Sequence, residues 1–253
     1  MCKKPQVIFS VKSLEDTVNI VTSFFDSEES LNSTTTKHIA NFFGLNLASF
    51  KDKTFEECKA IVEEVLTPIY KVKLKQMENK VKVFQEHFNS YSNLICAEFE
   101  KIFRVKFNGI RYFDAYVNLN NVCPRYLNND SFDICYVSSP ENATKTAVHE
   151  LIHFYWFDLF KEVMPEISED NFEFPHPAWM LSEIAVDPII YFSELSKLNF
   201  KQPAYEQFYK ATLNGENLIE SFRKLYKANS LPKFMERGLK ILENNPELVK
   251  NLL

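Results

Sequence analysis

Glycine is scarce in this chain, and its scarcity limits the folds open to it. Only 4 of the 253 residues are glycine. Architectures with many tight turns, such as β-propellers and β-barrels, need glycine where the backbone takes a positive φ. Glycine-rich phosphate-binding loops need it as well. The composition therefore disfavours these folds and predicts a protein rich in helix.

The hydrophobic pattern predicts helices on both sides of a central region. Residues 13–66 indicate about three short amphipathic helices, one of which begins at a capping box from Thr54 to Glu57 and ends at Pro68. Residues 69–103 form a long helical pattern, which we expect to back a sheet. Further helices are predicted at 178–195, 203–213, 216–229 and 233–251, the last one interrupted near Pro246.

Between these regions the pattern alternates with the period of a β-strand. Residues 104–107 and 110–119 are strand-like and are separated by a turn at Asn108 and Gly109. Residues 131–138 form another strand, which leads into the next helix. The order of helices, a small mixed or antiparallel sheet and further helices predicts the α+β class.

One short motif stands out: His149, Glu150 and His153 form the sequence HExxH. On a helix the two histidines lie one turn apart on the same face, so both imidazoles can bind one zinc ion. Glu150 lies about 100° round the helix. There it can take a proton from a water that the metal activates. The motif therefore predicts general-base chemistry at a metal ion.

The residues around the motif indicate a helix with one apolar face. Ser139, Pro140 and Glu141 are typical of an N-cap, a first helical position and a first turn. The apolar face lies nearly opposite the histidines and consists of Val148, Leu151, Ile152, Tyr155 and Leu159. A lone histidine is usually a core residue, but two at this spacing favour metal binding. We expect the helix to bury the apolar face and to present the histidines on the other.

A catalytic zinc ion needs a third protein ligand and an open fourth position. The metzincin pattern is excluded, because Trp156 and Leu159 stand where its glycine and third histidine would be. Asp158 follows His153 by five residues and points about 140° away from it. The third ligand is therefore expected from a downstream helix.

Two Glu-x-x-x-Asp pairs follow the motif, and their surroundings distinguish them. Glu166 and Asp170 lie in an acidic segment rich in proline, which is typical of a solvated loop. Glu183 and Asp187 lie in an apolar helical segment, where a buried carboxylate needs a partner or a metal. We predict Glu183 as the third ligand. The alternative is that Glu183 forms an ion pair between helices.

Asp187 lies one helical turn after Glu183. It is predicted to accept the second ring N–H of a zinc-bound histidine, His149, and so to fix the tautomer of that ring. Pro188 follows at once, and a proline at this place predicts a kink or a break in the helix.

With these residues the chain resembles the gluzincin clan of zinc metallopeptidases, of which the thermolysin-like enzymes are the familiar members. The resemblance covers about residues 130–195. It implies a zincin-like fold in a compact member, zinc ligands at His149, His153 and Glu183, a general base at Glu150 and an outer hydrogen-bond partner at Asp187. The spacing from His153 to Glu183 is longer than in the thermolysin pattern. The candidates for the family's transition-state-stabilising group are His176, Tyr191, Tyr205, Tyr209 and Tyr226.

The resemblance also suggests a division of the chain and a place for the substrate. We assign residues 1–67 to an N-terminal helical region and 68–253 to a zincin-like catalytic domain. In proteins similar to this one, the strand before the active-site helix forms the edge of the sheet. The strand at 131–138 is therefore expected to bind an extended peptide through its backbone.

Charge and composition narrow the expected partners and location. The net charge of −5 comes with no broad basic face, so we expect no nucleic-acid partner. No stretch reaches about 18 apolar residues and no signal peptide is visible, so we expect a cytoplasmic protein without a membrane segment. The odd number of cysteines predicts neither a disulfide framework nor a second zinc site. They are Cys2, Cys58, Cys96, Cys123 and Cys135.

Together these features predict a zinc-dependent metallopeptidase that acts on a peptide or protein substrate. The alternative is a catalytically inactive interaction or regulatory protein that keeps the zincin-like fold. Glu150 favours the enzyme, because a structural zinc site needs no carboxylate there and usually has a protein ligand in the fourth position.

Overall fold

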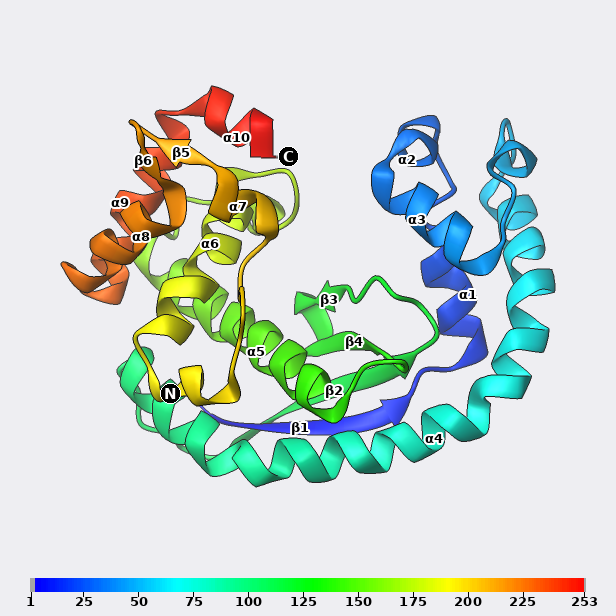
Figure 1. Cartoon of the computed structure of the whole chain (residues 1–253), viewed down its shortest axis with the longest axis horizontal. Coiled ribbons are helices and arrows are strands. Elements are labelled where there is room, and N and C mark those ends of the chain that lie inside the picture. The colour runs from blue at the N-terminus through cyan, green and yellow to red at the C-terminus, as the bar shows by residue number, and fades with distance from the viewer. Residues whose placement is uncertain (1–2, 253) are drawn as a thin grey trace. The chain divides into compact units, whose positions relative to one another are not determined.

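The computed structural model describes residues 3–252. The described chain is mostly helical and contains a small mixed sheet, so the predicted α+β class is confirmed (Figure 1). Contacts within the chain divide it into two units. The sheet unit contains Gln6–Ser90 and Tyr112–Ala147, and the motif unit contains Tyr91–Arg111 and the chain from Val148 onward, with the residues up to Pro5.

Within the described residues, the sheet has four strands in the order β1, β2, β4, β3. Their bounds are β1 Lys4–Val11, β2 Ile110–Asn118, β3 Arg125–Tyr126 and β4 Ser131–Cys135. β2 runs parallel to β4, and β3 runs antiparallel to it. The sheet is therefore mixed. β1 was not predicted, although its alternate residues Pro5, Val7 and Phe9 are buried.

β4 is not the edge strand that the sequence suggested. It pairs with β2 on one side and with β3 on the other, and all five of its residues are buried. A further hydrogen bond joins Asp133 N to Pro124 O at 3.0 Å. Because β2 and β3 pair with opposite sides of β4, the expectation that this strand forms the edge of the sheet is wrong. That a peptide binds through its backbone stays a prediction.

A buried ion pair explains how β4 can lie inside the sheet although it carries an acid. Asp133 is fully buried, and its carboxylate accepts hydrogen bonds from Lys12 Nζ at 2.5 Å and from Asn118 Nδ2 at 2.6 Å. Burial raises the pKa of Asp133, although the Lys12 ammonium opposes the shift. The polar side chain is thus buried with partners and needs no solvated face.

The predicted strand at 104–107 is wrong, because these residues complete the end of a helix. Arg104 takes a positive φ of 53°, and Val105 N donates to Glu100 O at 3.1 Å. Phe107 N donates to the Glu100 side chain at 3.0 Å. This backbone turn satisfies carbonyls at the helix end, as a left-handed helix cap does.

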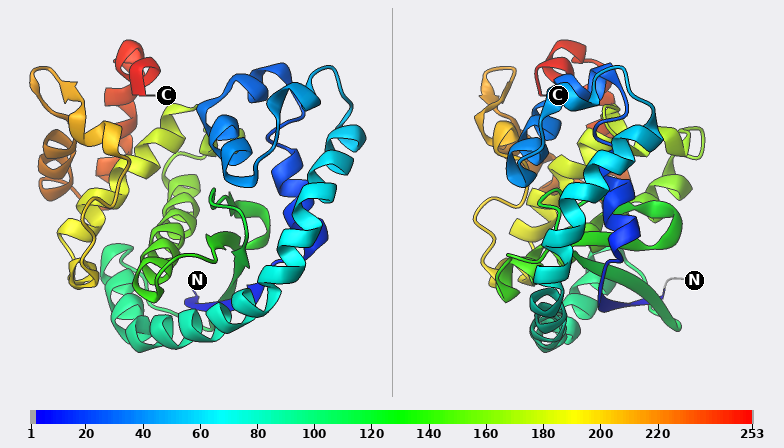
Figure 2. Two further views of the ribbon diagram at one scale, coloured as in Figure 1. Left: turned by 45° about the vertical axis from the view of Figure 1, so that its right-hand side comes forward. Right: turned by 90° about the vertical axis from the view of Figure 1, so that its right-hand side faces the viewer.

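Helix α4 (Phe55–Ile102) is one continuous helix of 48 residues (Figure 2). Its capping box is confirmed: Thr54 N donates to Glu57 Oε2 at 2.9 Å, and Glu57 N donates to Thr54 Oγ1 at 3.3 Å. The prediction that this helix ends at Pro68 is wrong. Proline removes one helical hydrogen bond, but tertiary contacts hold the helix before and after it: Leu66 is buried, and Tyr70 donates to Lys12 O at 2.8 Å. The predicted domain boundary at residue 67 lies inside α4 and stays a prediction.

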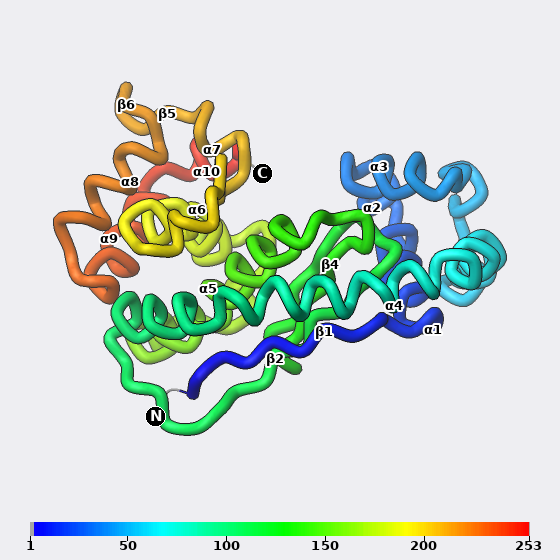
Figure 3. Tube along the Cα trace, turned by 60° about the horizontal axis from the view of Figure 1, so that its bottom comes forward, coloured from blue at the N-terminus to red at the C-terminus, as the bar shows by residue number. Residues whose placement is uncertain are grey.

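In the sheet unit α4 covers the edge of the sheet at β1 (Figure 3). Phe84 and Phe88 of α4 pack on Phe9, with ring centroids 6.1 and 6.0 Å apart. The Gln85 amide accepts from Phe9 N at 3.0 Å and donates to Val7 O at 3.1 Å. These bonds satisfy backbone groups that an edge strand otherwise exposes. The predicted helix that backs a sheet is confirmed for this part of α4.

Before Thr54 the described chain has three short helices, α1 (Leu14–Thr22), α2 (Glu28–Asn32) and α3 (Thr34–Phe43), and a 3-10 turn, η1 (Leu47–Phe50). The sequence predicted about three helices over residues 13–66, counting the one that begins at Thr54, so it predicted one too few. Ser13, Ser27 and Ser33 cap the three helices, each by accepting a backbone N–H in the first turn.

The motif unit is built around α5 (Pro140–Val163) and α6 (Pro177–Tyr191). Helices α8 (Leu218–Lys227) and α9 (Leu231–Glu243) pack on α6 (Figure 3). α9 approaches closely at Gly238, where a Cβ would lie only 2.6 Å from Leu181 Cδ1. From Ala178 to Ile190, every residue of α6 except Trp179 is therefore buried.

The helices predicted at 216–229 and 233–251 are confirmed as α8, α9 and α10 (Pro246–Leu252), but the one predicted at 203–213 is helical over five residues only and ends in a strand. Between α7 (Glu206–Lys210) and α8 a short hairpin joins β5 (Thr212–Leu213) to β6 (Glu216–Asn217). Asn214 and Gly215 form its turn with positive φ values of 52° and 82°, as a two-residue hairpin turn requires. α10 begins at the predicted interruption.

The sequence also predicted no membrane-spanning segment and no disulfide framework. Among residues 3–252, no helix combines the length and the apolar character needed to cross a lipid bilayer. Over the same residues Cys58, Cys96, Cys123 and Cys135 form no disulfide, and Cys2 lies outside the described part of the chain.

Candidate metal centre

Helix α5 carries the HExxH motif, and its start agrees with the sequence. It begins at Pro140, and Asn142 N donates to Ser139 Oγ at 3.2 Å. The helix then continues through the motif to Val163. His149 and His153 therefore lie one turn apart on the same side of α5, as predicted.

The histidine face of α5 is largely covered as well, although the sequence indicated one buried face. Every residue from Glu150 to Phe157 is buried, so α5 is buried on both faces around the motif. On the histidine side, Phe157 stacks on Phe172 with ring centroids 4.4 Å apart and lies parallel to the His153 ring at 6.3 Å. The periodicity of α5 alone could not reveal that a second element covers this face.

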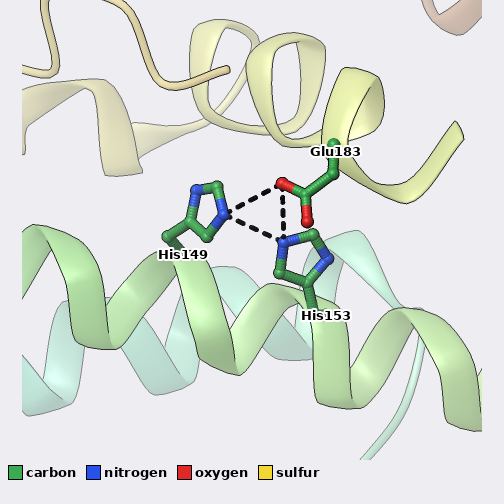
Figure 4. Close-up of side chains that lie close together, drawn as sticks. All are labelled: His149, His153 and Glu183. Carbon is green, nitrogen blue, oxygen red and sulfur yellow. Dashed lines mark hydrogen bonds and ion pairs between the residues drawn. The ribbon is translucent and has the colours of Figure 1, made fainter. Parts of the chain in front are cut away.

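The three predicted ligands converge (Figure 4). The Nε2 atoms of His149 and His153 lie 2.9 Å apart, and Oε2 of Glu183 lies 3.3 Å from each of them. An ion that binds such ligands tetrahedrally at about 2.0–2.1 Å separates the ligand atoms by about 3.3 Å. The three side chains therefore fit around one metal ion in the positions they already hold. Two imidazoles and a carboxylate are a ligand set that suits zinc and other first-row metals.

The charge of Glu183 is stabilised by the two histidines. Burial raises the pKa of Glu183, but its ion pairs and hydrogen bonds with His153 and His149 outweigh this effect and hold the pKa well below its usual value. The carboxylate is therefore ionised and available to bind a metal. A buried carboxylate of this kind requires a cation close by, either an imidazolium or a metal ion.

Solvent reaches the group of three residues at His149. The side chain of His149 is 22% exposed, whereas those of His153 and Glu183 are 0% and 4% exposed. Glu150 follows His149 in the chain and is also buried. In the described residues, no further His, Cys, Asp or Glu joins the group of three. A metal held here would keep a coordination position for a small molecule.

Asp187 has a different role from the predicted one. Its carboxylate accepts hydrogen bonds from Arg223 Nε at 2.6 Å and Nη2 at 3.0 Å, and from Tyr209 Oη at 2.5 Å. The predicted hydrogen bond from His149 is not among the bonds that Asp187 makes within the described chain. Asp187 is fully buried, and its contacts join α6 to α7 and α8. It therefore anchors the helix that supplies Glu183.

Helix α6 continues through Pro188, so the predicted break is absent. The helix ends three residues later, at Tyr191. No local pattern marks Arg223 or Tyr209 as partners of Asp187, since they follow it by 36 and 22 residues. Sequence reasoning missed both residues for that reason.

Four of the five candidate transition-state-stabilising groups make side-chain contacts of their own in the motif unit. Tyr209 donates to Asp187, and the ring of Tyr191 lies 3.9 Å from the Arg223 guanidinium carbon. Tyr226 packs against Phe192 and Phe234, and burial raises its pKa to about 12. Tyr205 lies near Trp179 and Phe208, with ring centroids 6.1 and 5.8 Å apart, and all five residues stay candidates.

The other acids near the motif, Asp158, Glu166 and Asp170, lie outside the candidate metal centre. Glu166 and Asp170 are exposed, and Asp170 belongs to a 3-10 turn, η3 (Glu169–Phe172). Asp158 forms an ion pair with Arg111. These positions agree with the choice of Glu183 over Glu166.

A pair of substitutions tests this choice of ligand. Glu183→Ala is expected to lower zinc affinity by more than the ~10–100-fold that loss of an outer hydrogen-bond partner costs. Glu166→Ala, which removes an exposed carboxylate, should leave the affinity unchanged. Competition against a chromophoric chelator measures both. Loss of zinc from the Glu166 variant alone would show that the third ligand is wrong.

Comparisons with protein-family models, with curated proteins and with solved structures find no match for this chain. The resemblance to gluzincins therefore rests on the motif and on the residues that gather around it. Any function must be inferred from the chemistry of that group.

Proposed function

We propose that this protein is a zinc-dependent peptidase with a zincin-like core. In this proposal His149, His153 and Glu183 hold the zinc ion, and Glu150 is the general base. The observation that carries the proposal is the triangle of two imidazole nitrogens and one carboxylate oxygen, with sides of 2.9, 3.3 and 3.3 Å.

The number of ligands supports a catalytic site over a structural one. Structural zinc sites bind the ion with four protein side chains, whereas catalytic sites use three and keep one position open. The group here has three members within the described residues, and the exposed part of His149 gives access to it. Glu150 is a further carboxylate that a structural site does not need.

Each residue of the proposed site has its own role in hydrolysis. A bound zinc ion supplies a Lewis acid that polarises a carbonyl group and lowers the pKa of water. Glu150 accepts a proton from the attacking water and passes it to the leaving amine. Its burial keeps bulk water from competing for that proton. The Asp187–Arg223 pair holds α6, and with it Glu183, in place.

Metal analysis combined with a cleavage assay tests the proposal. We expect the purified chain to contain one zinc ion and to cleave members of a mixed peptide library. A chelator should abolish cleavage, and added zinc should restore it. A chain that binds zinc but cleaves no peptide would support the alternative of an inactive interaction protein.

A further inference from the structure

Three aromatic side chains of the motif unit form an exposed cluster. The rings of Phe174 and Trp179 meet edge to face with centroids 5.3 Å apart, and Trp179 and Tyr205 lie 6.1 Å apart. Phe174 is 57% exposed and Tyr205 is 47% exposed. Large aromatic rings that gather at a surface commonly mark a binding site.

One member of the cluster, Trp179, lies on the same helix as the predicted metal ligand Glu183. Trp179 precedes Glu183 by four residues on α6, so the two side chains lie on one face, one turn apart. From Ala178 to Ile190, Trp179 is the one residue that is not buried. The face of α6 that carries Glu183 therefore opens to solvent at this cluster.

The chain around the cluster is strongly acidic. Between Lys161 and Lys197 the sequence contains no lysine or arginine. The exposed acids over the same stretch are Glu162, Glu166, Glu169, Asp170, Glu173 and Glu194, whereas Glu183 and Asp187 are buried. Lys161 pairs with Glu169 and Lys197 pairs with Glu194, while Glu166, Asp170 and Glu173 are exposed just before Phe174. A surface that combines acids with aromatic rings attracts cations.

We infer that the aromatic cluster recognises an arginine or lysine side chain of the substrate, close to the cleaved bond. The ring faces of Phe174, Trp179 and Tyr205 bind the cationic group by cation–π attraction, and they cover its methylene stem. The acids before Phe174 raise the local concentration of basic peptides. This inference rests on the proposed function, because it places the peptide at the metal centre.

The test compares an arginine peptide with its citrulline counterpart, which has nearly the same shape but no charge. Binding is measured by fluorescence anisotropy of labelled pentapeptides on the zinc-loaded Glu150→Gln variant, which is not expected to turn them over. We expect the arginine peptide to bind about 2- to 30-fold more tightly. Trp179→Leu and Tyr205→Leu should each reduce this ratio towards one. Tyr205→Leu changes an exposed side chain and keeps the test valid if Trp179→Leu does not fold.

Phe192→Leu is the matched control, because Phe192 is an exposed aromatic residue of the same unit that stacks on Tyr226 and not on the cluster. This variant should keep the full preference for the arginine peptide over the citrulline peptide.

Equal binding of the arginine and citrulline peptides, or tighter binding of a norleucine peptide, would overturn the inference. If the parent chain cleaves peptides without preference for a basic residue, the inference fails and the proposed function stands. If it cleaves none but binds the arginine peptide selectively through Trp179 and Tyr205, the proposed function fails and the recognition surface stands.

Discussion

Replacing Glu150 by glutamine is expected to lower peptide hydrolysis by at least about 100-fold while the zinc ion stays bound. Glutamine keeps the size of the side chain and can form hydrogen bonds, but it cannot accept the proton of the attacking water. The three proposed ligands, His149, His153 and Glu183, are unchanged in this variant. The measurements are kcat/KM for a peptide substrate and the zinc content of the same sample.

Glu162→Gln is the matched control for this prediction. Glu162 lies on the same helix, is exposed and does not belong to the metal-binding group. Its substitution should change kcat/KM by less than a factor of about two, since surface substitutions of this kind have small effects. Unchanged turnover in zinc-loaded Glu150→Gln would falsify the role of Glu150 as general base.

Arg223→Met is expected to lower the free energy of unfolding by about 3–5 kcal/mol, because it leaves a buried carboxylate without its cation. Asp187 is fully buried and would retain only the hydrogen bond from Tyr209. Asp187→Asn should lower the free energy of unfolding by less, about 1.5–3 kcal/mol. The Arg223 side chain that loses its partner in this variant is 19% exposed to solvent and keeps its ion pair with Glu220. Urea unfolding at constant zinc concentration measures both effects.

The same variants distinguish the observed role of Asp187 from the predicted one. If Asp187 oriented a zinc-bound histidine, Asp187→Asn would weaken zinc binding by about 10–100-fold. With its carboxylate engaged by Arg223 and Tyr209, we expect a change of less than about tenfold in the folded variant. Glu220→Gln is the control and should lower the free energy of unfolding by less than about 1 kcal/mol, because Glu220 is exposed. A large loss of zinc affinity without loss of stability would contradict the anchoring role.

Local signals in the sequence predicted much of the secondary structure. The Ser139 cap and Pro140 locate the start of α5, and the capping box at Thr54 locates the start of α4. The i,i+4 spacing of His149 and His153 requires only a helix to bring both rings to one side. Such features involve neighbours within a few residues, so no knowledge of the rest of the chain is needed.

Local signals failed where packing between distant segments overrode them. Pro68 is a helix breaker by itself, yet α4 continues because Leu66 and Tyr70 are held by tertiary contacts. The resemblance to gluzincins implied that the strand at 131–138 lies at the edge of the sheet, but pairing with β2 and β3 places β4 inside it. The apolar stripe of α5 suggested one buried face, although both faces are buried.

The sequence alone determined the histidine pair, the general-base candidate and a short choice of acids for the third ligand. Only the tertiary structure placed Glu183 within 3.3 Å of both histidines and joined Asp187 to Arg223 instead of His149. The physical reason is that a buried carboxylate takes whichever cation or donor the packing of other helices brings to it. Spacing along one helix determines which side chains share a face, and the packing of α6, α7 and α8 decides what those side chains meet.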